Sequence, residues 1–597
     1  MAPTPIGLYF FDLCGQILRE KRTSHGRQDA PVRSGLAGRG TEWSAKSPSG
    51  ALRWHGMGMV SCPADNRRDC DTTTNERCRG RIYPHRLVLL RRCGHLRCCR
   101  PRGRIGQVVK QAVKDTLIET AVVGVAALTG VLCLVWWLRA EAPVELAERL
   151  PTREEAERSA DGAAGGAPAR TDIRGVFQKS DGMPSSLTGM WSRFRGESSE
   201  NICRETEPLA ERWPEAGPPV VWSLALGEGH AGPAVRSGRV YVLDYDEAVR
   251  ADVLRCLSLD DGREIWRRWY HVRIKRNHGM SRTVPAVSDR YVVTVGPKCH
   301  ALCVDAETGA FGWGIDLVAD FGAKVPLWYT GQCPLIDDGI AVLAPGGTAL
   351  LIGVDCQTGQ VAWQTPNPRG WQMSHASVMP LTLCGRRMYV YCAIGGVIAV
   401  AADGPDRGEL LWETSDWSIP VVAPSPVAVG EDHVFVTAGY GAGSMMLRVA
   451  QSGNTYTVEP VWRLSKEVFG CEQQTPIFYR EHLFSVLPND AGEHRRELVC
   501  LTPEGRVAWT SGTEVRFGLG PFLIADGKIF VLNDDGVLTL AEARVDGYHP
   551  LAQAKVLDGR DAWGPMALVN GRLLLRDWKR MLCLDVRATP DSGGAKP

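Results

Sequence analysis

Residues able to bind an acidic ligand are concentrated in a few segments of the C-terminal two-thirds of the chain. The densest segment runs from Arg267 to Arg282 and mixes arginines, histidines and aromatic residues. Guanidinium groups suit carboxylates and phosphates, and an indole adds an apolar contact at low entropic cost. We predict that a ligand or partner is bound by Arg276, His278, Arg282, Trp371, His375, Arg516 and Trp563.

These side chains also have a plainer interpretation, as solvated charges and rim aromatics of surface loops. Trp328, Gln473 and Lys579 belong to the same group of loops. No catalytic residue and no metal ligand set is predicted in this region. The prediction therefore concerns binding, of an acidic and partly apolar ligand or an extended peptide.

The elements that would position these loops are repeats of one short pattern. In 304–313, Asp305 can bond to its own backbone, Gly309 supplies the positive φ of a tight turn, and Trp313 ends the following strand. Similar copies place tryptophans at intervals of 44 to 50 residues, which is the length of a four-stranded propeller blade. These structural tryptophans are Trp222, Trp266, Trp313, Trp363, Trp412, Trp462 and Trp509.

A second marker, a proline followed by apolar residues, gives the number of blades. Proline is tolerated at the first residue of a strand, so each one is expected to open the inner strand of a blade. The eight prolines are Pro233, Pro285, Pro334, Pro380, Pro426, Pro476, Pro521 and Pro565.

The two ends of the repeat array complement each other. The stretch Val220–Leu224 has the pattern of a fourth strand without the three that should precede it, and the last unit stops at Val586 without its fourth strand. Pairing the two closes the ring and removes both exposed sheet edges. We therefore predict an all-β, eight-bladed propeller closed by strand exchange.

The repeated Asp-x-x-Thr-Gly-x-x-x-Trp pattern, over roughly residues 215–586, resembles the PQQ-like (quinoprotein-type) propeller repeat proteins. The segment Trp191–Gly196 is similar to the start of planctomycete-type members, and its aromatics are expected to cap the propeller. The resemblance implies the fold more specifically than the activity, because the superfamily includes quinoprotein dehydrogenases and the non-enzymatic, BamB-like assembly factors.

A quinoprotein dehydrogenase would be expected to carry an adjacent-cysteine disulfide, a calcium site and an aspartate base. The one adjacent pair, Cys98 and Cys99, precedes the predicted propeller, and no Cys-x-x-Cys-His haem attachment occurs. We therefore lean towards a protein without enzymatic activity and without a cofactor. PQQ with calcium, serving an oxidoreductase, is the alternative.

Cysteines inside the repeats are interpreted as packing residues. Cys256, Cys303, Cys500 and Cys583 occupy the same third-strand position in their blades. Free cysteine behaves as a small hydrophobic residue, so a core role is favoured over catalysis. Disulfides between blades are an alternative in an oxidising compartment.

The first 104 residues differ from the rest in charge and pattern. They contain 18 Arg and 2 Lys against 8 acidic residues, whereas the whole chain has a net charge of only +2. The favoured interpretation is a disordered cytoplasmic extension; a mis-called start, nucleic-acid binding by the arginines and a zinc site around Cys93–Cys98 are alternatives. The remainder is mildly acidic, so no nucleic acid is expected to bind the propeller.

Residues 120–138 are uncharged and mostly apolar, and Trp136 and Trp137 fit an interfacial aromatic belt. This pattern predicts one transmembrane helix within an anchoring segment, 105–139, rather than a buried helix or a cleaved signal peptide. Basic residues before the span, such as Lys110 and Lys114, favour a cytoplasmic N-terminus. The propeller would then lie in the periplasm of a Gram-negative-type cell.

The remaining boundaries follow from composition. Residues 140–190 are rich in Ala, Glu and Gly and are expected to form a flexible stalk, 191–589 the propeller, and 590–597 a disordered tail. The expected function is a single-pass inner-membrane protein whose propeller binds envelope proteins or polymers as a scaffold.

Overall fold

The computed structural model describes only part of the chain, which divides into two compact units, 1–146 and 147–597. The described residues are 117, 120–121, 124–125, 127–134, 170–276 and 278–588. In the first unit the described residues are helical. No helix among the described residues is long and apolar enough to cross a membrane. The transmembrane helix stays a prediction. The predictions of a disordered extension (1–104), of the first part of the stalk (140–169) and of a disordered tail (590–597) concern residues outside the described ones.

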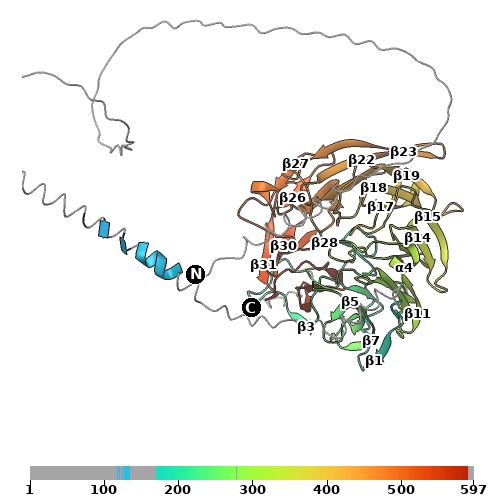
Figure 1. Cartoon of the computed structure of the whole chain (residues 1–597), viewed down its shortest axis with the longest axis horizontal. Helices are drawn as coiled ribbons and strands as arrows, with labels where there is room; N and C mark the ends of the chain where they lie inside the picture. Colours follow the sequence, from blue (N-terminus) through green and yellow to red (C-terminus); the bar gives the residue numbers. More distant parts are fainter. Residues whose placement is uncertain are drawn as a thin grey trace, which may run out of the picture. The chain divides into compact units, whose positions relative to one another are not determined.

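Eight antiparallel sheets, each built on four strands, follow one another around a ring in the second unit (Figure 1). Blade 1 consists of β4 (Ala234–Arg236), β5 (Arg239–Asp246), β6 (Ala251–Ser258) and β7 (Glu264–His271), and blade 2 of β8 (Ala286–Val287), β9 (Tyr291–Val295), β10 (His300–Asp305) and β11 (Phe311–Asp316). Blade 3 consists of β12 (Leu335–Asp337), β13 (Ile340–Leu343), β14 (Ala349–Asp355) and β15 (Val361–Pro366), and blade 4 of β16 (Met379–Leu383), β17 (Arg386–Ala393), β18 (Gly396–Ala401) and β19 (Leu410–Thr414).

The other half of the ring repeats this plan. Blade 5 consists of β20 (Val427–Val429), β21 (His433–Ala438), β22 (Gly443–Ser452) and β23 (Thr455–Leu464), and blade 6 of β24 (Ile477–Tyr479), β25 (His482–Val486), β26 (Leu498–Leu501) and β27 (Val507–Thr510). Blade 7 consists of β28 (Phe522–Ala525), β29 (Lys528–Leu532), β30 (Val537–Glu542) and β31 (Pro550–Lys555), and blade 8 of β32 (Ala567–Val569), β33 (Arg572–Arg576), β34 (Arg580–Asp585) and β3 (Val220–Ala225).

The ring closes by strand exchange, as the sequence predicts. Strand β3 pairs antiparallel with β34, and the register places Trp222 opposite Cys583. At the centre, the first strand of blade 8, β32, contacts β4 of blade 1. Seven of the eight prolines immediately precede or nearly precede an inner strand, and Pro380 is the second residue of β16. The prediction of an eight-bladed, all-β propeller is confirmed.

Each repeat tryptophan lies in a fourth strand and docks on the next blade. The indole nitrogen of Trp266 donates to the Glu307 carbonyl (3.0 Å), and that of Trp313 donates to the Cys356 carbonyl (3.0 Å). Gly309 has a positive φ, and a side chain there would overlap the Trp266 ring. The turn motif and the tryptophan are therefore the two halves of one contact between blades.

The repeated cysteines are packing residues. Cys256, Cys303, Cys500 and Cys583 are fully buried, and all are free thiols. Burial raises the pKa of the Cys500 and Cys583 thiols to about 12. Such thiols are protonated at neutral pH, which fits a role in the core.

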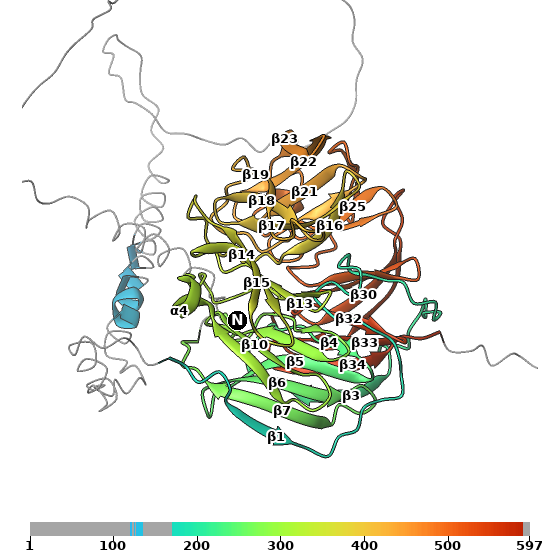
Figure 2. The same cartoon turned by 90° about the vertical axis from the view of Figure 1, so that its right-hand side faces the viewer.

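Short elements decorate the ring. Strand β1 (Val176–Lys179) adds to the outer edge of blade 1 by pairing with β7 (Figure 2), although 140–190 is expected to be a flexible stalk. The edge of β7 offers unpaired backbone groups, and β1 satisfies them. A short helix, α4 (Leu317–Phe321), is capped by Asp316, and a 3-10 turn, η2 (Gly492–His494), precedes β26.

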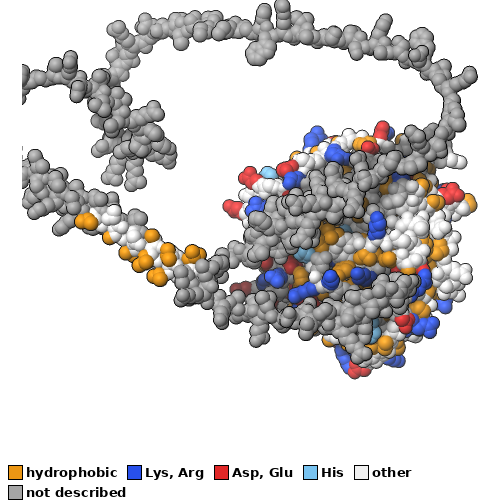
Figure 3. Space-filling model, in the orientation of Figure 1, with side chains coloured by type: hydrophobic (Ala, Val, Ile, Leu, Met, Phe, Trp, Pro, Cys, Tyr) orange, Lys and Arg blue, Asp and Glu red, His pale blue; other side chains and the backbone are white. Residues whose placement is uncertain are grey.

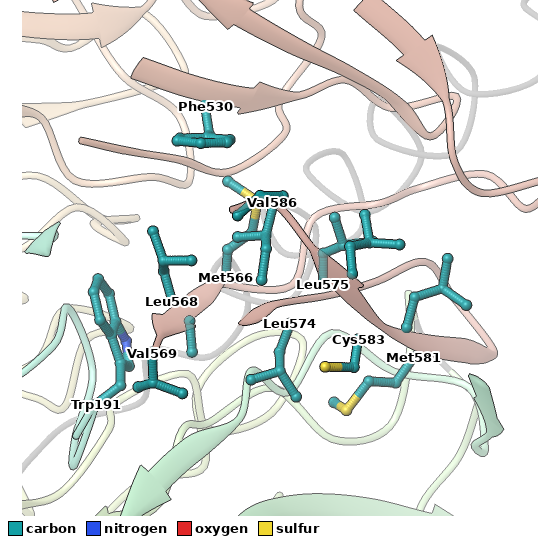
Figure 4. Close-up of a cluster of buried hydrophobic side chains, with 14 of the residues drawn as sticks. Trp191, Phe530, Met566, Leu568, Val569, Leu574, Leu575, Met581, Cys583 and Val586 are labelled. Atoms are coloured by element: carbon teal, nitrogen blue, oxygen red, sulfur yellow. The ribbon is translucent and has the colours of Figure 1, made fainter. Parts of the chain in front are cut away.

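A segment ahead of β3 enters the channel from one end, and we call residues 188–205 the channel loop. Trp191 pairs with Val235 of β4, and Figure 4 shows it in the apolar cluster beside Leu568 and Val569. Strand β2 (Ile202–Cys203) then runs parallel to β28. The expectation that the aromatics of 191–196 cap the propeller agrees with this arrangement.

Candidate functional site

The channel has two different ends because the connections between strands alternate. Turns between first and second strands, such as the one containing Asn570, lie at the end from which the channel loop comes, since Asn570 contacts Gly189. Connections from a fourth strand to the next first strand lie at the other end, which we call the mouth. The channel loop rises as far as Arg195, which reaches the start of β24.

Between the channel loop and the mouth lies a cavity of about 130 Å³, with Phe194 of the loop among its lining residues. A volume of this size holds several waters or one side chain. Its principal polar and aromatic walls are His230, Arg282, Trp328, His375, Tyr440 and Trp563.

A repeated position supplies much of this lining. The residue three positions before the strand-opening proline points into the cavity in six blades, because the chain enters every inner strand in the same way. These residues are His230, Arg282, Gly331, Ser377, Ala423 and Gln473.

Arg282 is the cation of the cavity. Its Nε donates to the Trp328 carbonyl (2.6 Å), and an Nη donates to the His278 carbonyl. Burial lowers the pKa of Arg282 to about 10, so the guanidinium remains charged at neutral pH. These two carbonyls help to orient the guanidinium.

Two histidines share the cavity with Arg282 and are held neutral. Burial, and then the charge of Arg282, lowers the pKa of His375 to about 4. Burial, Arg282 and Arg576 lower the pKa of His230 well below its usual range. The His230 ring lies 5.1 Å from that of Trp563; the backbone of His278 is near, but no described group reaches either ring nitrogen with hydrogen-bond geometry.

Aromatic side chains cross the mouth above these groups. The Trp328 ring stacks on His375 (6.1 Å between centroids) and on Tyr440 (5.9 Å), which come from different blades. Trp328, Tyr329 and Tyr440 all have positive φ, a backbone conformation that costs bulky residues free energy. Leu327 beside them is 62% exposed, and Tyr440 is 56% exposed.

One acid also lines the cavity. Burial raises the pKa of Glu472, and this carboxylate accepts the Asn489 N–H (3.2 Å). The hydroxyl of Tyr440 is close enough to Glu472 to interact with it, and burial raises the pKa of Tyr440 to about 12. The site thus combines one charged guanidinium, two neutral imidazoles and one carboxyl group whose pKa is raised by burial.

The structure brings together only some of the predicted site residues. Arg282, His375 and Trp563 line the cavity, and His278 lies at its rim with its ring 6.4 Å from that of Trp328. Arg276, with 66% of its side chain exposed, instead pairs with the buried Glu228, which also binds Lys579 (3.2 Å).

Trp371 and Arg516 lie outside the cavity. Trp371 is buried against Gly395 and Gly396, because Asn367 bonds to both its N–H and its carbonyl and folds the loop back. Arg516 pairs with the fully buried Glu497 (3.4 Å). Both residues therefore support the fold locally.

Among the cavity residues that sequence reasoning missed are Phe194, His230, Tyr440 and Glu472. The signal for His230 is present, since it stands three residues before Pro233, where Arg282 stands before Pro285. Tyr440 comes from a connection between second and third strands, and Phe194 from outside the repeats. Neither has a repeated position that would mark it.

Comparisons with known proteins agree with this fold. Residues 250–491 match the family described as outer membrane protein assembly factor BamB. Similar solved structures include BamB from Moraxella catarrhalis (13% identity, 62% of this chain and 99% of that chain, TM-score 0.40) and quinohemoprotein alcohol dehydrogenase from Comamonas testosteroni (12%, 68% and 82%, 0.47).

A europium-containing methanol dehydrogenase is also similar, with 11% identity over 65% of this chain and 89% of that chain, and a TM-score of 0.47. No curated protein gave a match. The resemblance stated from the repeats is confirmed: this chain carries a PQQ-like, BamB-like eight-bladed β-propeller.

Proposed function

We propose that the protein is a binding module of the cell envelope, a scaffold that holds other envelope proteins at the mouth of its propeller. The observation that carries this proposal is the asymmetry of the channel. The channel loop occupies one end, whereas the mouth presents the exposed Leu327 and Tyr440 at a cavity that contains a cation. Apolar and aromatic side chains left exposed at one place on a surface are a mark of protein-binding sites.

The match to a family named for outer membrane protein assembly supports an envelope role. The apolar stretch 120–138 supports membrane anchoring, with the propeller on the periplasmic side. The face of the propeller seen in Figure 3 mixes basic, acidic and apolar side chains. Such a surface suits proteins better than nucleic acid, which favours a single-sign basic patch.

The alternative is an oxidoreductase that uses PQQ with calcium. Calcium in proteins takes six to eight oxygen ligands. Among the described residues lining the cavity, Glu472 is the one carboxylate, and no cluster of three His, Cys, Asp or Glu in the described part of the chain could hold a metal ion. The residues present do not fit a calcium-bound quinone, so we derive no reaction from one.

Site-specific photocrosslinking in cells tests the scaffold. A benzophenone side chain at Leu327 should yield crosslinks to the same few envelope proteins in repeated experiments. The matched control is Val361, which is 42% exposed on the outer strand of the same blade. Equal crosslinking from both positions, or crosslinks from Leu327 only to abundant cytoplasmic proteins, would contradict the proposal.

A redox assay tests the alternative. The full-length protein, supplied with PQQ and calcium, should not reduce an electron-accepting dye when alcohols or sugars are added. Saturable, substrate-dependent dye reduction that is lost in Arg282→Gln would favour the oxidoreductase.

A further inference from the structure

We propose that the cavity at the mouth binds one acidic side chain of a partner polypeptide, with the carboxylate against Arg282 and a neighbouring apolar residue against Leu327 and Tyr440. This assignment rests on the proposed function and adds the chemistry of the contact. It names the part of a partner that the propeller would recognise.

The first argument is electrostatic. The charge of Arg282 contributes to lowering the pKa of both His230 and His375, so the cavity disfavours additional positive charge. A carboxylate would reverse that penalty and receive charge-assisted hydrogen bonds from a guanidinium already fixed by two carbonyls. Preorganisation of this kind reduces the entropy lost on binding.

The second argument concerns unused hydrogen-bonding capacity. His230 is 5% exposed, lines the cavity, and has no partner of hydrogen-bond geometry at either ring nitrogen among the described residues. A buried polar atom without a partner costs roughly 1–3 kcal/mol. In its neutral form the ring has one N–H, which can donate to an incoming carboxylate.

Glu472 is the group that an acidic ligand must overcome. It lines the same cavity, but its pKa is raised by burial and it is engaged by the Asn489 N–H. The Asn489 N–H offsets part of the negative charge that Glu472 would present to a ligand. Arg282 and the neutral histidines therefore set the preference of the cavity.

The third argument favours a polypeptide over a small free anion. A cavity of about 130 Å³ accepts a side chain, while Leu327 lies outside it and Tyr440 lines it with more than half of its surface still exposed. Stacking of the Trp328 ring on His375 and on Tyr440 joins these side chains into one aromatic rim. A ligand that extends beyond the cavity is needed to cover such a rim.

A matched pair of peptides tests the proposal on the full-length protein labelled with 5-fluorotryptophan. The Trp328 ¹⁹F signal is assigned with Trp328→Phe. The pentapeptide acetyl-Ala-Phe-Glu-Phe-Ala-amide should shift this signal saturably. The same peptide with Gln in place of Glu should bind about tenfold more weakly, because one charge-assisted contact is lost.

Arg282→Gln should weaken binding of the Glu peptide to the level of the Gln peptide. Lys579→Gln, which removes an exposed cation on the same face outside the cavity, should leave binding unchanged. If Arg282→Gln lowers the melting temperature so far that the variant is not folded, the difference in affinity between the Glu and Gln peptides for the unsubstituted protein still tests the proposal.

Equal binding of the two peptides would overturn the proposal. So would propionate shifting the Trp328 signal at the same concentration as the Glu peptide, because the cavity would then take a small free anion. Crosslinking from Leu327 is independent of this result. If the peptides bind equally but Leu327 still crosslinks to envelope proteins, the acidic contact is wrong and the proposed scaffold function is retained.

Discussion

Two arginines are enclosed in the propeller channel, one in the channel loop and one at the mouth, and they have opposite roles. Arg195 of the channel loop is 4% exposed and donates to four backbone carbonyls, those of Ser199, Glu200, Thr475 and Pro476. Arg282 at the mouth faces a cavity shared with two neutral histidines. Arg195 therefore holds the channel loop in place, and Arg282 gives the cavity at the mouth its positive charge.

The difference shows how a propeller can separate stability from binding. Burial lowers the pKa of Arg195 to about 9, and its charge is stabilised by carbonyl dipoles from the loop and from blade 6. The mouth instead contains strained backbone, exposed aromatic side chains and His230, whose ring nitrogens have no hydrogen-bond partner among the described residues. Such features add little to folding and suit a ligand.

The largest expected effect is on the closed end. Arg195→Met should lower the free energy of unfolding by about 3–5 kcal/mol, because buried carbonyls lose their donors. Urea unfolding measures the change, and Arg204→Met, at a mostly exposed position of the same loop, should cost at most about 1 kcal/mol. Equal losses in the two variants would mean that Arg195 does not hold the loop.

The mouth should show its charge as a pH dependence. The pKa of His375 is about 4 in the folded protein and near 6.5 in an unfolded chain. Above pH 6.5 both states are neutral; as the pH falls towards 4 the unfolded chain takes up a proton first, so stability is lost across this window, by at most about 3 kcal/mol.

His375→Gln should remove this dependence, as measured by urea unfolding at pH 7 and pH 4.5. His271→Gln, at an exposed position, serves as the control. An unchanged slope in His375→Gln would show that the imidazole is not held neutral by its surroundings.

The smallest expected effect is on the rim. Tyr440→Ala should change the free energy of unfolding by less than about 1 kcal/mol, because the side chain is 56% exposed. Thermal unfolding measures it. A loss comparable to that of Arg195→Met would assign Tyr440 to the fold rather than to the mouth.

The ring itself could be predicted because its markers are local. A tryptophan ending a fourth strand and a proline opening a first strand each have one structural reason, and it applies in every blade. Closure by Val220–Ala225 followed from the missing strand at each end. Strand β1 could not be foreseen, because its exposed Val176–Lys179 has no buried face to mark it.

The cavity was harder to predict, because it is made by residues that meet only across the ring. Trp371 and His375 lie four residues apart, yet the Asn367 bonds bury the first and leave the second in the cavity. Arg276 does not reach the cavity because its guanidinium pairs with Glu228, a residue from another blade. Loop composition indicated the correct face of the propeller, and loop geometry decided which side chains reach the centre.

Hydrogen exchange tests the contrast between the two ends most directly. The amides of Trp191 and Asn201 bond to the carbonyls of Val235 and Arg195, both at 2.8 Å, so residues 191–202 should exchange as slowly as the inner strands. Residues 326–329 and 439–442 at the mouth should exchange much faster and gain protection when a partner binds. Fast exchange throughout 191–202, at the rate of the mouth segments, would contradict the account of a closed end and an open one.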